Sequence, residues 1–333
     1  MKNSFNLRDT LSIAFLSKQE GQVSILDESL ELYFSQLQER EIHVFTGVKP
    51  PMNNMDSIRD FARSKFSSAV ISFSTEEKAC ILYVIKEITY VLNKNNLGLI
   101  SKYPWKFIKI ENWLCGGFAH TRGNCIIISQ KHLDLLTTNW STNMSKNDQK
   151  SLVNKFGQLL IHEQFHCLQR TRKDIFEILY RESWGFRKVK VLDENFIILN
   201  QLSNPDAPIP EWAYYLNGEY YWVRTLIKEN IERPKMGADF IDLVFILNHR
   251  SDKFYIKRDE LGDLVKFPLV EFSPYINRFP VKRGLDHPNE ISAYMFSSYV
   301  ISLLNDSIPF VNVSVKAKAN TQKFIHWTKN YLN

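Results

Sequence analysis

The segment 162–166 reads His-Glu-Gln-Phe-His, and it constrains this chain more than any other stretch of the sequence. It lies within residues 150–170, whose apolar spacing predicts a helix. Residues four apart lie on one face of a helix, so both imidazoles would point the same way and could hold one metal ion. Glu163 would project from the flank of that pair, where its carboxylate could reach a water molecule on the same metal. The pattern therefore predicts a metal-assisted hydrolytic site with Glu163 as general base.

The surroundings of this pattern favour a metal site over a chance match. A five-residue pattern can arise by accident, and two histidines without a metal are the alternative interpretation. The match lies late in the predicted amphipathic helix, however, and apolar residues flank it on both sides. These residues are Leu159, Leu160, Ile161, Phe165 and Leu168.

Composition indicates a folded protein with an ordinary surface. The 333 residues are 44% hydrophobic and 13% aromatic, enough for a substantial core and unlike a disordered chain. The formal net charge is +6, from 42 basic and 36 acidic residues, and the basic residues form no long run. Scattered charge is typical of a solvated surface, so we expect no nucleic-acid partner. A basic nucleic-acid binder is kept only as the weakest alternative.

The four cysteines are predicted to be free thiols. Their spacing fits neither a disulfide framework nor a C-x-x-C metal site. They are Cys80, Cys115, Cys125 and Cys167. Cys167 directly follows the second histidine of the pattern and would point away from a metal held by that face of the helix.

No signal core or membrane span is visible in the sequence. Residues 1–9 lack an apolar signal core, and no apolar run approaches the length of a transmembrane helix. We therefore expect a cytoplasmic protein without a membrane partner. Export by a route that needs no classical signal stays open, and the sequence indicates no oligomeric state.

Residues 1–100 are predicted to be mostly helical and to form an accessory region. Helix-like spacing is found at 11–15 and 24–37, and helices are expected at 56–66 and 75–92. A block with strand character follows, at 105–110 and 125–129. A short apolar element at 133–136 and a polar loop at 137–147 then lead to the helix of the pattern, which Ser145 or Asn147 could cap.

The remaining residues complete an expected catalytic domain spanning 101–333. A helical stretch is predicted at 174–180, and a β-rich antiparallel insertion at about 200–280 contains strand-like runs. These runs lie at 218–228, 239–247 and 253–272. Helices are predicted at about 286–304, where Pro288 fits a first turn, and at 321–332.

The order of strands, loop and pattern-bearing helix resembles the zincin metallopeptidases. The resemblance implies an α+β fold in which a small twisted sheet precedes the active-site helix within residues 101–175. It also implies a mostly helical N-terminal region and a C-terminal helical subdomain. In zincins an edge strand of the sheet lines the cleft and pairs with extended substrate. Here 125–129 would be the strand nearest the helix in sequence, and its position in the sheet is left open.

A third metal ligand must come from elsewhere in the chain. Catalytic zinc usually has three protein ligands and a water, and no Gly-x-x-His continuation follows His166. Glu290 follows Pro288 in the first turn of a predicted helix. This Asn-Glu start resembles the third-ligand helix of thermolysin-like gluzincins. The chain departs from that pattern in its long insertion and in having Tyr294 where an acidic residue is expected. A tyrosine there could donate a hydrogen bond to an oxyanion.

Several alternatives for the site residues remain open from the sequence. Glu290 could be an ordinary first-turn glutamate favoured by the helix dipole. The other candidates for the third ligand are Glu177, Glu182 and His287. The other candidates for an oxyanion donor are His120, Tyr220 and Tyr221.

The resemblance implies a zinc-dependent peptidase. One zinc ion would be held by His162, His166 and Glu290, with Glu163 as general base and Tyr294 assisting. The partner would be a peptide or protein substrate. The alternative is a non-catalytic zincin-like protein that binds metal or uses it structurally. Neither the substrate nor a choice between endopeptidase and exopeptidase follows from the residues.

Overall fold

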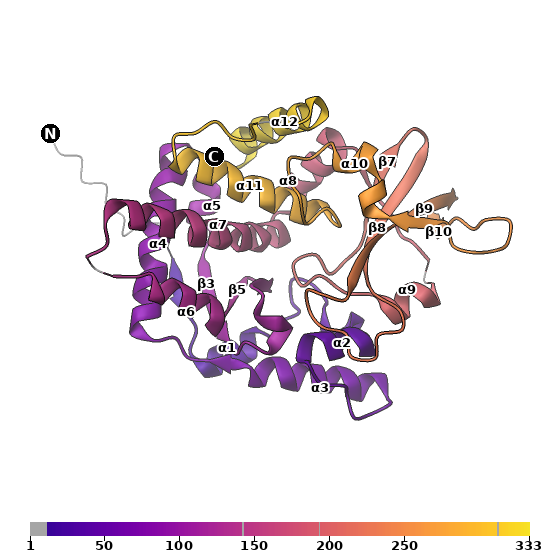
Figure 1. Cartoon of the computed structure of the whole chain (residues 1–333), viewed down its shortest axis with the longest axis horizontal. Helices are drawn as coiled ribbons and strands as arrows, with labels where there is room; N and C mark the ends of the chain where they lie inside the picture. The colour runs from indigo at the N-terminus through magenta and orange to yellow at the C-terminus, as the bar shows by residue number, and fades with distance from the viewer. Residues whose placement is uncertain (1–11, 142, 193, 312) are drawn as a thin grey trace.

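The computed structural model describes residues 12–333 except 142, 193 and 312 (Figure 1). The N-terminal segment 1–9, expected to lack a signal core, lies outside the described residues. Two sheets and a layer of long helices make up the described chain, so the expected α+β class is confirmed. No helix among the described residues has both the length and the apolar character needed to cross a membrane.

The first sheet contains both predicted strands of the central block. Its strands are β1 (Ile13–Phe15), β2 (Val70–Ile71), β3 (Trp105–Ile110), β4 (His120–Arg122) and β5 (Cys125–Ser129). Their order is β1-β3-β5-β4, with β2 beside β3. The strands β1, β3 and β5 are parallel, and β4 turns back antiparallel to β5. β5 is buried along its whole length and lies inside the sheet, which leaves the short strand β4 at the edge.

The N-terminal third is helical, with two corrections to the expectation. Its helices are α1 (Lys18–Ser24), η2 (Phe34–Gln36), α2 (Glu39–Thr46), α3 (Met55–Ser68), α4 (Thr75–Lys94) and α5 (Gly98–Lys102). The helix predicted at 11–15 is wrong over its described part, because 13–15 pairs with β3 as a strand. Within 24–37, helical turns are limited to the end of α1 and the three residues of η2. The strands β1 and β2 pair with β3. The boundary expected near residue 100, between the N-terminal accessory region and the rest of the chain, therefore falls within one sheet.

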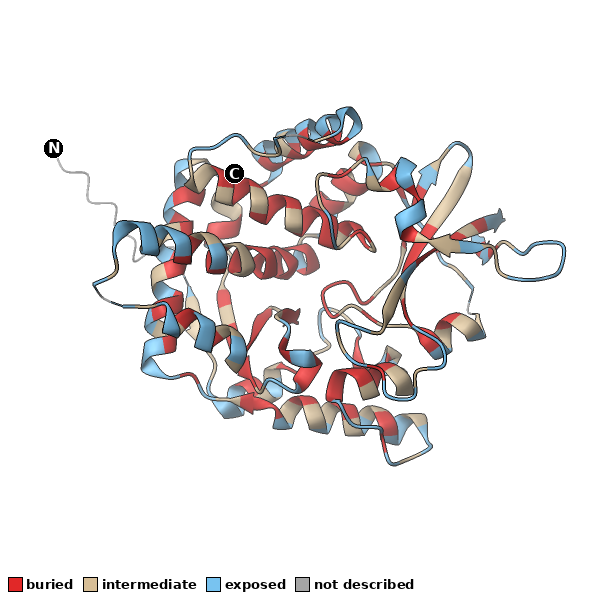
Figure 2. Ribbon diagram, viewed as in Figure 1, coloured by how far each residue is buried: buried red, intermediate tan, exposed pale blue. Residues whose placement is uncertain are grey.

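The pattern-bearing helix is the central element of the structure. η3 (Leu114–Gly117) and α6 (Gln130–Thr138) precede it, and it extends as α7 over Lys146–Thr171. Ser145 caps it, since the Ser145 hydroxyl accepts from the backbone N–H of Asp148. Gly157 allows α4 to approach closely, because a Cβ there would lie 3.2 Å from Ile88 Cδ1. Every residue from 160 to 170 is buried, so the half of α7 that carries His162 and His166 is a core helix rather than an amphipathic one (Figure 2).

The expected antiparallel insertion is present as a second sheet. Its strands are β6 (Phe186–Lys188), β7 (Trp212–Leu216), β8 (Glu219–Ile227), β9 (Phe240–Arg250), β10 (Lys253–Ile256) and β11 (Lys266–Pro268). They follow the order β10-β9-β8-β7-β6, with β11 beside β9. Between α7 and β6 lie α8 (Lys173–Ile178) and η4 (Leu179–Ser183), and α9 (Asn195–Asn200) lies between β6 and β7. Asn217 and Gly218 both have positive φ in the two-residue β7–β8 turn, the backbone that tight hairpins need.

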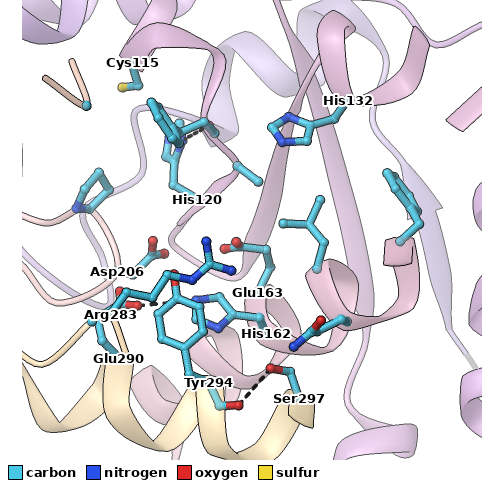
Figure 3. Close-up of a pocket in the computed structure, with 18 of the residues that line it drawn as sticks. Cys115, His120, His132, His162, Glu163, Asp206, Arg283, Glu290, Tyr294 and Ser297 are labelled. Carbon is cyan, nitrogen blue, oxygen red and sulfur yellow. Dashed lines mark hydrogen bonds and ion pairs between the residues drawn. The ribbon is translucent and has the colours of Figure 1, made fainter. Parts of the chain in front are cut away.

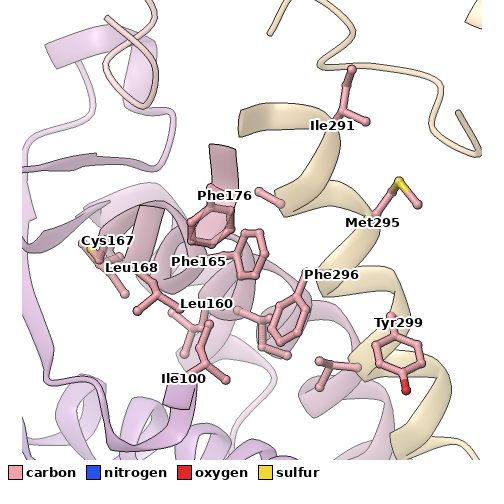
Figure 4. Close-up of a cluster of buried hydrophobic side chains, with 14 of the residues drawn as sticks. Ile100, Leu160, Phe165, Cys167, Leu168, Phe176, Ile291, Met295, Phe296 and Tyr299 are labelled. Atoms are coloured by element: carbon pink, nitrogen blue, oxygen red, sulfur yellow. The ribbon is translucent and has the colours of Figure 1, made fainter. Parts of the chain in front are cut away.

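The C-terminal part of the chain is helical, and one of its helices packs along α7. The helices of this part are η5 (Leu269–Glu271), α10 (Ser273–Ile276), α11 (Pro288–Leu304) and α12 (Val315–Tyr331). α11 runs alongside α7, and the rings of Phe165 and Phe296 stack with centroids 4.5 Å apart (Figure 4). The α12 helix begins earlier than expected because the Ser314 hydroxyl accepts from Ala317 N–H and caps it there. The packing of α11 along α7 places the first turn of α11 next to the buried half of α7.

Candidate metal centre

Three side chains from α7 and α11 converge on one point. His162 and His166 extend from α7, and Glu290 extends from the first turn of α11. The two Nε2 atoms are 3.1 Å apart, and the Glu290 oxygens lie 3.4 Å from Nε2 of His162 and 3.5 Å from Nε2 of His166. Zinc–ligand bonds of about 2.0–2.1 Å in a tetrahedron place neighbouring ligand atoms about 3.3 Å apart. The donor set and its spacing therefore fit a single zinc ion.

Gln169 orients one of the histidines. Its Oε1 atom lies 2.7 Å from His166 Nδ1, so that nitrogen donates and the Nε2 lone pair faces the centre. The Gln169 amide nitrogen also donates to Asn289 O at 3.0 Å and to Ser292 Oγ at 2.9 Å. One side chain thus fixes the ring of His166 and joins α7 to α11. The sequence prediction missed Gln169, although its place three residues after His166 on the same helix face was a usable signal.

Opposite charges stabilise each other in this buried cluster. Burial alone would raise the pKa of Glu290, but the positive charge of His166 and hydrogen bonds from both imidazoles hold it well below its usual value. Burial lowers the pKa of His166. The charge of the Glu290 carboxylate opposes this effect and raises the pKa of His166 to about 9. Burial lowers the pKa of His162. Asn204 donates to Glu290 Oε1 at 2.8 Å and fixes that carboxylate.

Glu163 lies beside this cluster without a partner. Its side chain is buried, and its Oε2 atom has no hydrogen bond within the described part of the chain. Burial, and next the charge of Asp206, raises the pKa of Glu163 well above the usual value of a carboxyl group. A carboxyl group that binds a proton this readily is suited to moving protons near neutral pH.

The cluster opens into a cavity of about 1030 Å³ (Figure 3). His162, Glu163 and Glu290 lie on its wall, and α6 and the first half of α7 line the end away from them. Both polar and apolar side chains line that end. The apolar ones include Leu135, Met144, Leu152, Phe156 and Leu159. A cavity of this size and lining can hold several residues of a peptide.

Comparison of the chain with known protein-family models, with curated proteins and with solved structures gives no match. The chemistry available at this site is therefore inferred from its own residues.

Tyr294 is held against one of the histidines. Its ring centroid is 4.3 Å from that of His162, and the Arg283 guanidinium lies over its other side, with Cζ 4.8 Å from the ring centroid. Gly284 has a φ of +66°, and a Cβ there would lie 2.5 Å from Tyr294 Cε2. A residue without a side chain is needed at 284, because the loop passes directly over the tyrosine ring.

The structure separates the other candidate residues from the cluster. His287 caps α11, with its Nδ1 accepting from Asn289 N–H. Glu177 pairs with Lys188 and Glu182 is exposed, and neither belongs to the metal-binding group. Tyr220 and Tyr221 extend from β8, where their rings pack on other aromatic residues of the second sheet region. Of these alternatives only His120 lines the cavity.

A buried network of ion pairs and hydrogen bonds connects the wall of the cavity to other segments of the chain. Arg170 pairs with Glu31 at 2.9 Å and donates to the backbone oxygen of Pro205 at 2.5 Å. Its guanidinium also donates to Thr121, whose N–H in turn donates to the Asp206 carboxylate at 2.7 Å. These residues come from four separate segments, and sequence reasoning identified none of them. The network ties the edge strand β4 to α7.

We expect Arg170→Met to destabilise the fold by about 3–5 kcal/mol, because it leaves buried carboxylates without their partner. Its side chain is 2% exposed. Arg172→Met is the matched control, since Arg172 is 40% exposed and pairs with Asp174 on the surface. The control should change the unfolding free energy by about 0–1 kcal/mol. Urea unfolding of both variants checks this, and equal losses would contradict the account of the network.

Zinc affinity should rise with pH. A histidine binds metal in its neutral form, and His166 in the metal-free protein has a pKa of about 9. Below that pH, metal binding must displace a proton, so affinity should increase about tenfold per pH unit from neutral pH to about 9 and then level off. Competition with a chelator of known affinity, measured at pH 7, 8, 9 and 10, checks the slope. A zinc affinity that stays constant between pH 7 and pH 9 would show that zinc binding displaces no proton from His166.

Proposed function

We propose that this chain is a zinc-dependent metallopeptidase. The observation that carries the proposal is the unpartnered carboxyl group of Glu163, buried beside the cluster of two imidazoles and one carboxylate at the wall of a large cavity. A site that only stores a metal has no need of this extra carboxyl group. A carboxyl group in this position is what hydrolysis requires of a general base.

The residues of the site divide the work of peptide hydrolysis. Bound zinc would supply a Lewis acid that polarises the substrate carbonyl and makes its bound water more acidic. Glu163 would accept the proton of the attacking water at its free Oε2 atom and pass it to the leaving amine. Its raised pKa suits the second transfer, because the protonated form is stable enough to donate, and the positive charge of bound zinc would favour the ionised form that the first transfer needs.

Tyr294 is a better candidate than His120 for the hydrogen-bond donor to the oxyanion. Burial, and next the charge of Glu290, raises the pKa of Tyr294, so its hydroxyl keeps its proton and can donate. His120 uses Nδ1 to donate to Phe118 O at 3.1 Å, and burial lowers its pKa. Neutral His120 therefore presents an acceptor at Nε2 and cannot stabilise an oxyanion.

The alternative of a structural metal site has less support. Structural zinc sites are usually closed by four protein ligands, whereas the described residues form a group of three. These three face a cavity, which leaves room for a water and a substrate. The arrangement therefore favours catalysis over a structural role.

Peptide hydrolysis can be tested without knowing the natural substrate. Metal-loaded protein is incubated with a mixture of peptides from a digested proteome, and mass spectrometry identifies new termini. We expect cleavage that disappears after chelation and returns with stoichiometric zinc. Absence of any cleavage by folded protein carrying one zinc per chain would contradict the proposal.

A further inference from the structure

The outer edge of strand β4, beside the proposed metal ligands, is covered by other segments of the chain. Thr121 in the edge strand β4 pairs with Ile126 of β5 on one side. On the other side its N–H donates to Asp206 at 2.7 Å, and its carbonyl accepts from Arg170 at 3.3 Å. The outer edge of β4 is thus already occupied at Thr121. An extended substrate cannot pair with the strand there.

A short loop, 204–207, provides this cover and is itself held in place. Asn204 donates to Glu290 Oε1 at 2.8 Å, so the loop contacts a proposed metal ligand directly. Arg170 donates to the carbonyl of Pro205, and Asn204 Oδ1 accepts from Asp206 N–H at 2.9 Å. The loop therefore runs from β4 to α11 along the wall of the cavity.

Two residues of the cavity wall at this loop have hydrogen-bond acceptors without donors. Asp206 uses Oδ1 to accept from Thr121 and to pair with Arg170, while its Oδ2 has no hydrogen bond or ion pair within the described chain. His120 is 3% exposed, and its Nε2 atom is buried without a partner among the described residues. Both residues line the cavity, as Figure 3 shows. Because His120 Nδ1 is already the donor to Phe118 O, Nε2 can only accept.

Two carboxylates share one guanidinium beside these acceptors. Arg170 pairs with Glu31 at 2.9 Å and with Asp206 at 3.9 Å. A ligand group that satisfies a carboxylate and a neutral imidazole together must supply hydrogen-bond donors, and a cationic donor forms the stronger bond with the carboxylate.

We propose that Asp206 and His120 bind the free α-ammonium group of a peptide, which makes the enzyme an aminopeptidase. The inference rests on the proposed peptidase function. The ammonium would sit beside the 204–207 loop, its residue would lie over the proposed metal ligands, and the rest of the peptide would extend along the part of the cavity lined by α6 and α7. The bond cleaved is the one that follows the first residue, or the first few, of the chain.

Blocking the ends of one peptide tests this directly. A hexapeptide is compared with its N-acetylated and its C-amidated forms on zinc-loaded enzyme. Acetylation should lower kcat/KM by about 30-fold or more, as expected when one partner of a buried charge pair is removed. Amidation should change it less than about threefold. Equal cleavage of the free and acetylated peptides would show an endopeptidase and overturn the proposal. A loss on amidation alone would overturn it too, and would indicate that the guanidinium of Arg283 binds a terminal carboxylate instead.

Variants separate binding of the ammonium from a purely structural role. Asp206→Asn should raise KM for the free peptide by about tenfold or more, with a smaller effect on kcat, and should reduce the preference over the acetylated form. Asp174→Asn, a change of the same kind on an exposed residue of α8, should leave both constants unchanged. Equal preference in Asp206→Asn and wild type would contradict the role. If Asp206→Asn does not fold, the end-blocked peptides still decide the question.

Peptide binding to a variant without the general base tests the ammonium site independently of peptide hydrolysis. Zinc-loaded Glu163→Gln protein is titrated calorimetrically with the free and the acetylated hexapeptide. Tighter binding of the free form, by about 30-fold or more, supports the ammonium site even if no form is hydrolysed by wild type. Equal binding overturns the ammonium site even if wild type cleaves peptides.

Discussion

Replacing Glu163 with glutamine is expected to reduce peptide hydrolysis by about 10²–10⁴-fold, because glutamine cannot take a proton from the attacking water. Zinc should still bind in the same amount, since the three proposed ligands are unchanged. The substitution should not reduce the stability of the folded protein. Glu163 Oε2 has no hydrogen bond to lose, and burial disfavours its charged form. The thermal midpoint of the variant should equal or exceed that of wild type.

The control for this variant is a glutamate remote from the site. Glu260→Gln changes an exposed residue between β10 and β11 and should leave kcat/KM unaltered. Rates and zinc content are measured on the same protein preparations. Glu163→Gln protein with full zinc and wild-type rates would refute the role of Glu163 as base. A variant that loses its zinc would instead make Glu163 a ligand.

Replacing Glu290 with glutamine should weaken zinc binding by about 100-fold or more and reduce hydrolysis accordingly. Even loss of a side chain that only orients a ligand costs 10–100-fold in metal affinity, and Glu290 supplies both a donor atom and the negative charge beside the imidazoles. Without that carboxylate, the largest influence that raises the pKa of His166 against the effect of burial is lost, so the pH dependence of zinc affinity should flatten.

The other acidic candidates provide matched controls for Glu290. Glu177→Gln and Glu182→Gln change residues of α8 and η4 that lie outside the metal-binding group. Equilibrium dialysis with zinc at fixed pH should separate Glu290→Gln from both controls. Undiminished affinity in Glu290→Gln, or a loss in either control, would assign the third ligand differently.

Local signals explain which parts of the site could be predicted from the sequence. The strands at 105–110 and 125–129 were predicted with their observed bounds, because both are short, apolar and bounded by turn residues. Pro288 marked the first turn of α11, and a first-turn glutamate there extends from a helix that packs along α7. The position of Glu290 beside both histidines follows from that packing.

The unpredicted parts depend on contacts between distant segments. The edge strand β4 is only three residues long and pairs with the adjacent β5, while its outer edge contacts Asp206 and Arg170, 85 and 49 residues away from Thr121. No periodicity marks such a pairing. The strand at 13–15 was mistaken for helix because so short an apolar run carries no distinct period. Its partner in β3 is what makes it a strand.

The most direct test of the account is to locate zinc in the folded protein. Metal-free protein is loaded with one equivalent of zinc and crystallised, and anomalous scattering is measured on both sides of the zinc edge. The account predicts one peak per chain, about 2.0–2.2 Å from Nε2 of His162, Nε2 of His166 and an oxygen of Glu290. The absence of stoichiometric zinc, or a peak bound by cysteine sulfur or by other carboxylates, would contradict it.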